Sequence, residues 1–284
     1  MNNIFKYSVC VFSIIFFFTS CQTNEKTDVE NAGLKGNVKS VREISYEAFG
    51  NADTLVKGDI ISTNDSKNCF ISYNRNGYIT NVTEYDEYNE KNSTWLYRYD
   101  KKGERILNSV FLSPNNEVID SISYIYGKYR QAKEYVRYSE GEVVKKFQRT
   151  FDKKGNITSE KILTSDNSIE RISKFLYSND LLKEVQVLDD NNNILSECYY
   201  TYDNKKNMSS MTLFGGDKKY ISKGKYLYNK EGFISCEVIS RPGYTDLNLN
   251  YIYTTDAKGN WVQRIMLSDN EAYKITTRQI EYYD

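Results

Sequence analysis

The sequence offers few residues for catalysis, because it contains no histidine. Histidine is the side chain that most readily exchanges a proton near neutral pH, and Ser-His or Cys-His nucleophilic sites require it. Paired carboxylates are a remaining route, as in glycoside hydrolysis. Most of the 38 Asp and Glu residues fall in predicted turns, however, where capping of the backbone accounts for them. We therefore assign no catalytic residue and expect a protein that is not an enzyme.

The sequence evidence for metal binding and for reactive thiols is equally weak. Asp189 and Asp190, within LDDNNNI (188–194), offer hard oxygen ligands that suit calcium. The stretch lacks the spacing of an EF-hand loop, so a plain hairpin loop is favoured, and we predict neither a metal site nor a cofactor. The cysteines Cys69, Cys198 and Cys236 match no zinc-ligand spacing.

Three aromatic residues interrupt an otherwise regular pattern and are therefore candidates for ligand binding: Trp95, Trp261 and Tyr244, the last in an RPGY loop. Aromatic faces stack on apolar surfaces such as those of sugars, while phenol hydroxyls form hydrogen bonds. The same side chains also serve as cross-strand core pairs, and the 26 tyrosines of the chain favour that structural role in general. A binding site is expected where the repetition breaks.

The elements that position these residues form an internal repeat. An aromatic residue precedes a turn at intervals of 25 to 28 residues, at Tyr46, Tyr73, Tyr99, Tyr126, Phe151, Tyr177, Tyr202 and Tyr228, and the series continues at Thr255 and Tyr283. A period this regular indicates a repeat architecture. Between the turns, aromatic residues alternate with other residues, as at Tyr97 and Tyr99, and period two indicates strands.

Each repeat contains two turns. The first reads aromatic, Asp or Asn, two polar residues and Gly, as in YDKKG (99–103) and FDKKG (151–155), which predicts a type I turn followed by a bulge. The second lies half a period later and varies, for example SPNNE and DDNNN. The sequence thus predicts an all-β antiparallel meander of about nine 26-residue hairpin repeats, which we expect to form a coiled or rolled sheet with tyrosines inward.

The meander also predicts the state of the cysteines. At about 4.8 Å per strand, Cys69 and Cys198 lie near 48 Å apart and Cys198 and Cys236 near 14 Å apart. A disulfide needs Cα atoms within about 7 Å. We therefore expect buried free thiols.

The motifs YDKKGERI, FDKKGNIT and YNKEGFIS resemble the YD repeats of RHS-type proteins over most of the chain after about residue 36. YGKYR, YSNDL and YDNKK depart from the pattern in lacking its Gly. In large RHS toxins such repeats build a hollow β-shell around a toxic domain. The resemblance implies the β-repeat architecture here and not toxin activity, because there are too few units for a large shell.

The N-terminus is expected to be a targeting segment. Lys6, the apolar run 9–18 and Ser20 before Cys21 resemble the signal peptide and lipobox of bacterial lipoproteins, with Phe18 where Leu is more usual. The apolar run is shorter than the roughly 20 residues of a spanning helix. The predicted domains are a signal peptide (1–20), a flexible tether (21–35) and the YD-like β-repeat domain (36–284), with a lipid on Cys21.

These observations favour a non-enzymatic lipoprotein of the bacterial outer membrane, facing the surface or the periplasm, that binds a glycan or an envelope protein or serves as a scaffold. Its formal net charge is zero, from 38 basic and 38 acidic residues, which gives no support to nucleic-acid binding. Two alternatives are a carboxylate-dependent enzyme acting on polysaccharide and an immunity or partner protein of an RHS-like toxin.

Overall fold

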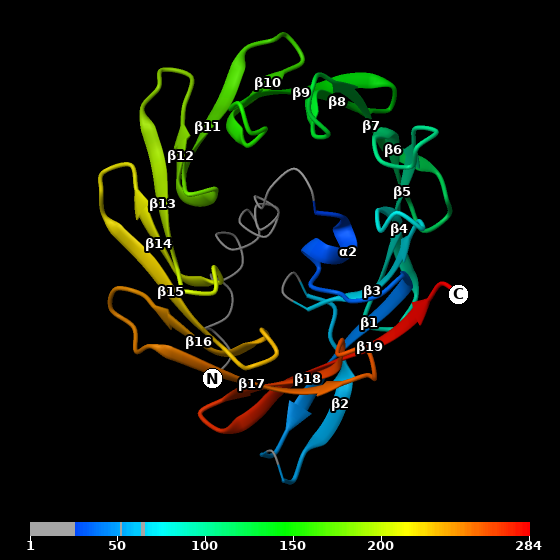
Figure 1. The fold of residues 1–284 in the computed structure, drawn as a ribbon, viewed down its shortest axis with the longest axis vertical. Helices are drawn as coiled ribbons and strands as arrows, with labels where there is room; N and C mark the ends of the chain where they lie inside the picture. Colours follow the sequence, from blue (N-terminus) through cyan, green and yellow to red (C-terminus); the bar gives the residue numbers. More distant parts are fainter. Residues whose placement is uncertain (1–25, 52, 64–65) are drawn as a thin grey trace.

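The computed structural model describes residues 26–51, 53–63 and 66–284 and shows one antiparallel sheet closed into a ring (Figure 1). The described residues contain one helix, α2 (Asp28–Asn31). The strands are β1 (Val38–Phe49), β2 (Val56–Ile60), β3 (Asn68–Tyr73), β4 (Ile79–Tyr85), β5 (Lys91–Tyr99), β6 (Ile106–Leu112), β7 (Val118–Tyr126), β8 (Ala132–Ser139), β9 (Glu142–Phe151), β10 (Ile157–Thr164), β11 (Ile169–Ser178), β12 (Leu181–Leu188), β13 (Ile194–Tyr202), β14 (Met208–Gly215), β15 (Tyr220–Tyr228), β16 (Ile234–Ser240), β17 (Leu247–Thr255), β18 (Trp261–Ser268) and β19 (Glu271–Tyr282).

The sheet closes because β1 pairs with β19 on one side and with β3 on the other. From β3 to β19 each strand pairs with the next, so β1 and β3–β19 form an eighteen-strand barrel, while β2 pairs only with the end of β1. The all-β antiparallel meander is confirmed, but the expected coiled or rolled repeat sheet of about nine hairpins was wrong, because the sheet closes into a barrel. Closure satisfies the backbone groups of both end strands, which an open sheet would leave unpaired.

The repeat period corresponds to strand ends. Most of the aromatic residues that define it are the last residue of a strand, including Tyr73, Tyr99 and Tyr126. The amide of Asn74 then donates to the carbonyl of Tyr78, and that of Gly77, at φ 80°, donates to Asn74. The register shifts at Tyr73, which confirms the predicted turn with its bulge. Tyr46 is an exception, since β1 continues past it to Phe49.

The face of each strand that points into the ring follows from α2, which lies within the outline of the ring in Figure 1. Val29 of α2 packs in one buried cluster with Val41 of β1 and Tyr73 of β3. Directly opposed residues share a face of a sheet. Following the register from these two residues around the ring assigns most tyrosines of the repeat to the inner face, among them Tyr97, Tyr124 and Tyr226. The expectation that the tyrosines point inward is thereby confirmed.

Repeated hydrogen bonds explain why the repeat uses tyrosine and not phenylalanine at most positions. The hydroxyl of a strand-end tyrosine donates to the carbonyl that follows the previous first-type turn, 20 residues back in the chain. Where Thr255 replaces the aromatic residue, Tyr253 makes the corresponding bond to Ile234 at 2.8 Å. The donor–acceptor pairs of the regular repeats are Tyr99–Ile79, Tyr126–Ile106, Tyr202–Leu182 and Tyr228–Met208.

The outer face has a different composition. Charged side chains stand in the middle of strands on this face, beside isolated aliphatic ones such as Leu176 and Leu227, which are 54% and 64% exposed. The lysines at outward positions include Lys146, Lys161, Lys174, Lys223 and Lys225. The inner face is therefore rich in apolar and aromatic side chains, with ion pairs such as Arg149–Glu160 among them, whereas the outer face is mixed polar.

Residues 26–35, assigned to the flexible tether from the sequence, are instead folded onto one end of the barrel. The side chain of Thr27 caps α2 by accepting from Glu30, and Val29 and Leu34 are 6% and 7% exposed. The amide of Lys35 donates to the side chain of Asn260 at 2.7 Å. Any tether is thus confined to residues before Lys26; Cys21 and the predicted signal peptide lie outside the described residues. No helix within the described part of the chain is long and apolar enough to span a membrane.

Candidate functional site: a charged aromatic cluster on the inner face

Charged groups gather around Trp261, the first residue of β18. The Arg278 guanidinium lies 3.5 Å from the centre of the indole ring, and that of Arg264 lies 5.1 Å from it. Arg264 also lies 5.8 Å from the ring of Tyr251. Two cations thus face one aromatic side chain, an arrangement that attracts anions and is favoured by the π-electrons of the indole. We call Glu43, Glu237, Tyr251, Trp261, Arg264 and Arg278 the inner cluster.

Only one of the two arginines forms a close ion pair. The Arg278 Nε donates to the Glu43 carboxylate at 2.7 Å, and both side chains are almost buried. Arg264 forms no ion pair with any carboxylate of the described residues, and its side chain is only partly buried. Its positive charge nevertheless acts on Glu43 and Glu237, whose carboxylates balance it in part. A partly buried guanidinium that forms no close ion pair can still donate hydrogen bonds to a ligand.

The two carboxyl groups of the inner cluster have opposite pKa shifts. Burial raises the pKa of Glu43, but the cations around it, Arg278 first, outweigh this and hold the pKa below its usual value. For Glu237, burial dominates and raises the pKa, although the Tyr251 hydroxyl donates to this carboxylate at 3.0 Å. A pair of acids with divergent pKa values is typical of acid–base catalysis.

The positions of Glu43 and Glu237 argue against that chemistry. Glu237 lies on β16 and Glu43 on β1, with β17, β18 and β19 between them. Four strand spacings amount to about 19 Å between their backbones, whereas the two carboxyl groups of a glycosidase are about 5 to 9.5 Å apart. The inner cluster is therefore arranged for binding.

Trp95, the second tryptophan, lies on the inner face about five strand spacings away from Trp261, in a purely aromatic row. Its ring centre is 6.3 Å from that of Tyr97 and 4.9 Å from that of Phe111. A separate group on the inner face contains Tyr124 and Tyr135, whose rings are 6.0 Å apart, with Arg149 4.9 Å from the Tyr135 ring. These rings stabilise one another, so we interpret Trp95 as part of the structural wall.

Tyr244, the third aromatic candidate, does not lie beside either tryptophan. It lies in the loop between β16 and β17 and is 73% exposed. It has no described ring or charge partner, so the structure does not join the three sequence candidates into one site.

The calcium candidates serve the turn that contains them. The Asp189 carboxylate accepts from the amides of Asn191 and Asn193 and from the Asn193 side chain, and these bonds lower its pKa. Asp190 accepts from the Asn191 side chain. Among the described residues, no group of three His, Cys, Asp or Glu side chains is placed to hold a metal ion.

The three described cysteines are free thiols, as predicted. Cys69 and Cys198 are buried, and burial raises the pKa of each to about 11. Cys236 is only half-buried, which differs from the prediction. A thiol with a raised pKa is unreactive at neutral pH, so Cys69 and Cys198 have structural roles.

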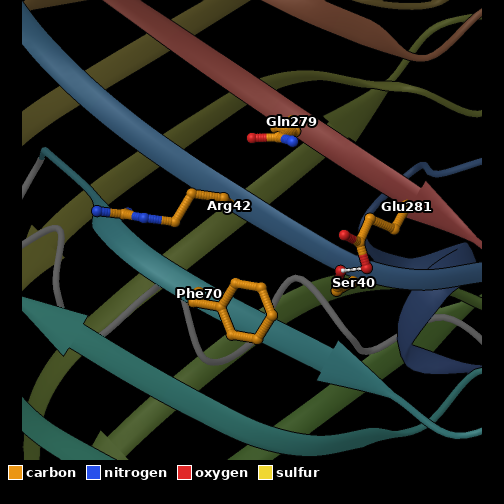
Figure 2. A pocket seen from close by; sticks show the side chains of 5 residues that line it. All are labelled: Ser40, Arg42, Phe70, Gln279 and Glu281. Carbon is orange, nitrogen blue, oxygen red and sulfur yellow. Dashed lines mark hydrogen bonds between the residues drawn. The ribbon is translucent and has the colours of Figure 1, made fainter.

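A depression of 190 Å³ on the outer face, where β1 meets β3 and β19, is a weaker candidate (Figure 2). Most of its polar groups already have partners: Ser40 donates to Glu281 at 3.0 Å, and Arg42 donates to the backbone carbonyls of Glu43 and Cys69 and to the Asn68 side chain. Ligand pockets usually exceed about 300 Å³. The depression is best explained as a feature of the seam that closes the barrel.

Sequence reasoning found Trp261 but missed the charged residues around it. The alternation of inward and outward residues along each strand could have found two of them: Arg278 lies on the same face as Ile280, and Glu237 lies opposite Tyr226. Register shifts follow every first-type turn, so counting along the chain loses the face of Arg264. Its place opposite Tyr253 is clear only from the strand pairing.

Comparisons with known proteins give only distant similarities. No family model and no curated protein matches the chain. A porin-like protein from Bacteroides uniformis superposes with a TM-score of 0.46 and 11% identity, over 84% of this chain and 97% of that one. A porin-like protein from Bacteroides vulgatus gives 0.37 and 12%, over 88% and 99%. The Tc holotoxin pore of Photorhabdus luminescens gives 0.36 and 14%, over 73% of this chain and 12% of the toxin chain. At these values the similarities indicate neither a shared function nor a shared ligand.

Proposed function

We propose that this protein is a non-enzymatic, lipid-anchored barrel of the bacterial outer membrane that binds a saccharide at the inner cluster. The observation that carries the proposal is the half-buried Trp261 with Arg264, which forms no close ion pair, beside it. An indole face accepts the apolar face of a sugar ring, while a guanidinium donates several hydrogen bonds to its oxygens. An envelope protein as ligand is the alternative.

The proposed location depends on the lipid at Cys21 and agrees with the two faces of the barrel. A barrel that crosses a bilayer turns an apolar band toward the lipid, and a lysine at the midplane costs about 2 to 4 kcal/mol. Here lysines occupy outward positions in the middle of β10, β11 and β15. We therefore place the strands in water beside the membrane, held there by the acyl group.

Intrinsic fluorescence tests the proposal, because the chain has only two tryptophans. Saccharide fragments of envelope polysaccharides are titrated into the purified protein, and tryptophan emission is followed in the wild type and in Trp95→Phe and Trp261→Phe. Saturable change that persists in Trp95→Phe and disappears in Trp261→Phe supports the proposal.

Arg264→Gln is the companion variant, with Arg98→Gln on the outer face as its control. Loss of saccharide affinity in Arg264→Gln alone assigns the contact. No saturable change across the saccharides, or an equal loss in both variants, contradicts saccharide binding at this cluster. Saccharide turnover that survives purification would contradict the non-enzymatic role.

A further inference from the structure

The two ends of the barrel carry opposite charge, although the formal net charge of the chain is zero. In an antiparallel meander, alternate turns lie at opposite ends. The eight turns from β3–β4 to β17–β18 form one rim, at residues 74–78, 100–105, 127–131, 152–156, 179–180, 203–207, 229–233 and 256–260. The eight turns from β4–β5 to β18–β19 form the other, at 86–90, 113–117, 140–141, 165–168, 189–193, 216–219, 241–246 and 269–270.

The eight turns of the first rim hold 12 basic and 7 acidic residues, and we call it the basic rim. Residues 26–35 and Asp284, which lie at the same end, add two basic and three acidic residues, so the excess remains basic. Four of the seven acids, such as Asp100 and Asp152, accept hydrogen bonds from their own turns, so they lie close to the backbone. Most of the cations are exposed, although some lie against tyrosine rings or carboxylates, as Lys154 does with Asp180. The basic residues are Arg75, Lys101, Lys102, Arg105, Lys128, Arg130, Lys153, Lys154, Lys205, Lys206, Lys230 and Lys258.

The second rim holds 3 basic and 11 acidic residues, and we call it the acidic rim. Its basic residues are Lys218, Lys219 and Arg241, and Lys218 is paired with Glu197. The excess of acids is spread over most of the turns and reaches three residues in 86–90. The molecule therefore has a strong charge asymmetry along the barrel axis.

The polypeptide enters the barrel at the basic rim. The carbonyl of Lys26 accepts from Arg130, and the amide of Val29 donates to the carbonyl of Gly77. Both partners belong to turns of this rim. Cys21, the predicted lipid attachment site, is five residues before Lys26. Five residues span at most about 18 Å, so an acyl group on Cys21 would keep the basic rim close to the bilayer.

We propose that the basic rim is a docking surface for an anionic phospholipid bilayer, which holds the barrel upright with its acidic rim away from the membrane. Each lysine or arginine near an anionic surface strengthens binding, and a basic patch is the usual second signal beside an acyl chain. The orientation depends on the lipid at Cys21, whereas the attraction depends only on the rim. Saccharide binding at the inner cluster is not required for either.

Vesicle binding without the anchor tests the surface alone. The chain from residue 21 with Cys21→Ser is sedimented with vesicles of phosphatidylglycerol and phosphatidylcholine in equal parts, and with pure phosphatidylcholine. We expect binding to the anionic vesicles only. Raising NaCl from about 0.1 M to about 1 M shortens the screening length from about 10 Å to about 3 Å and should release the protein.

A matched pair of variants separates position from net charge. Lys101, Lys102, Lys205 and Lys206 are exposed on the basic rim, and changing all four to Gln should lower the vesicle partition coefficient about a hundredfold or more. The control changes four exposed lysines elsewhere to Gln, namely Lys161, Lys174, Lys219 and Lys225. An unchanged denaturation midpoint verifies folding of both variants, and Lys101→Gln with Lys102→Gln alone should give an intermediate loss.

Retained binding in the control variant supports the basic rim. Equal loss in the two variants would show a net-charge effect and overturn the proposal. So would equal binding to both kinds of vesicle, or binding to soluble heparin without binding to anionic vesicles. Failure of saccharide titrations at Trp261 leaves these outcomes unaffected, so the two proposals fail separately.

Discussion

From β11 to β15 the inner face of the barrel is mainly apolar, with Arg171 as an exception, whereas from β16 through β19 to β1 it carries the inner cluster. The first region is one continuous core of residues such as Phe175, Val185 and Met211. The second places Glu43, Arg278 and Arg264 around Trp261. Both regions have the same strand pairing and the same turns. The repeat therefore specifies the strand arrangement, and the residue types at inward positions specify the local chemistry of the inner face.

The largest effect is expected where the apolar wall is broken. Phe175 is 6% exposed, and Phe175→Ala should lower the free energy of unfolding by about 3 to 5 kcal/mol, because it leaves a cavity. Its neighbour Leu176 points outward and is 54% exposed, so Leu176→Ala is the control, expected near zero. Denaturant titration compares the two; similar losses would mean that the faces are assigned wrongly.

A slightly smaller loss is expected in the inner cluster. Arg278→Met leaves the Glu43 carboxylate buried without its partner and should cost about 3 kcal/mol. Adding Glu43→Gln to this variant should restore part of the loss, because the buried charge is removed. Arg98→Met, on the exposed outer position, should have little effect. No recovery in the double variant would contradict the ion-pair explanation.

The pH dependence of stability should separate the two carboxyl groups of the inner cluster. The pKa of Glu43 is lowered in the folded state, so its contribution is present above the unfolded pKa, about 4.3, and is lost as the pH falls through the folded value. Glu237 has a raised folded pKa, so its contribution is present at low pH and lost as the pH rises through that value. Glu43→Gln should flatten the acid side of the stability profile, and Glu237→Gln should raise stability at neutral pH; equal profiles would refute the assignment.

A medium effect is expected from the repeated tyrosine hydroxyl. Tyr228→Phe removes the hydrogen bond to the Met208 carbonyl at 2.9 Å and should cost about 1 kcal/mol. Tyr244→Phe, in an exposed loop, should leave the denaturation midpoint unchanged. An equally large loss of stability in Tyr244→Phe would contradict the structural explanation for the regularly spaced tyrosines of the repeat.

The smallest effect is expected at the loop that offered calcium ligands. Asp189→Asn weakens the hydrogen bonds to the Asn193 amide and side chain, so it should lower the denaturation midpoint by less than Tyr228→Phe does. Asp190 accepts a hydrogen bond from only one neighbouring side chain, so Asp190→Asn should lower the denaturation midpoint still less. Added calcium should not shift the midpoint of the wild type; a clear upward shift would restore the metal-site interpretation.

The amino-acid sequence was enough to predict the repeat, the strands, the turn type with its bulge and the inward tyrosines, because each depends on residues close together in the chain. Phe151 and Tyr228 end their strands as their spacing predicts. It also determined that Cys69 and Cys198 are free, since strand spacing separates them.

Closure of the sheet is visible only in the folded structure. It pairs Val41 with Ile280, which lie almost a whole chain apart, and no local sequence pattern encodes that pairing. The same holds for one member of the inner cluster: Glu43 on β1 meets Arg278 on β19 only after closure, whereas the other members lie on the consecutive strands β16 to β19. The opposite charges of the two rims follow from the sequence once the order of turns is known. Their relation to the entering chain depends on how Lys26 and Val29 dock onto the barrel.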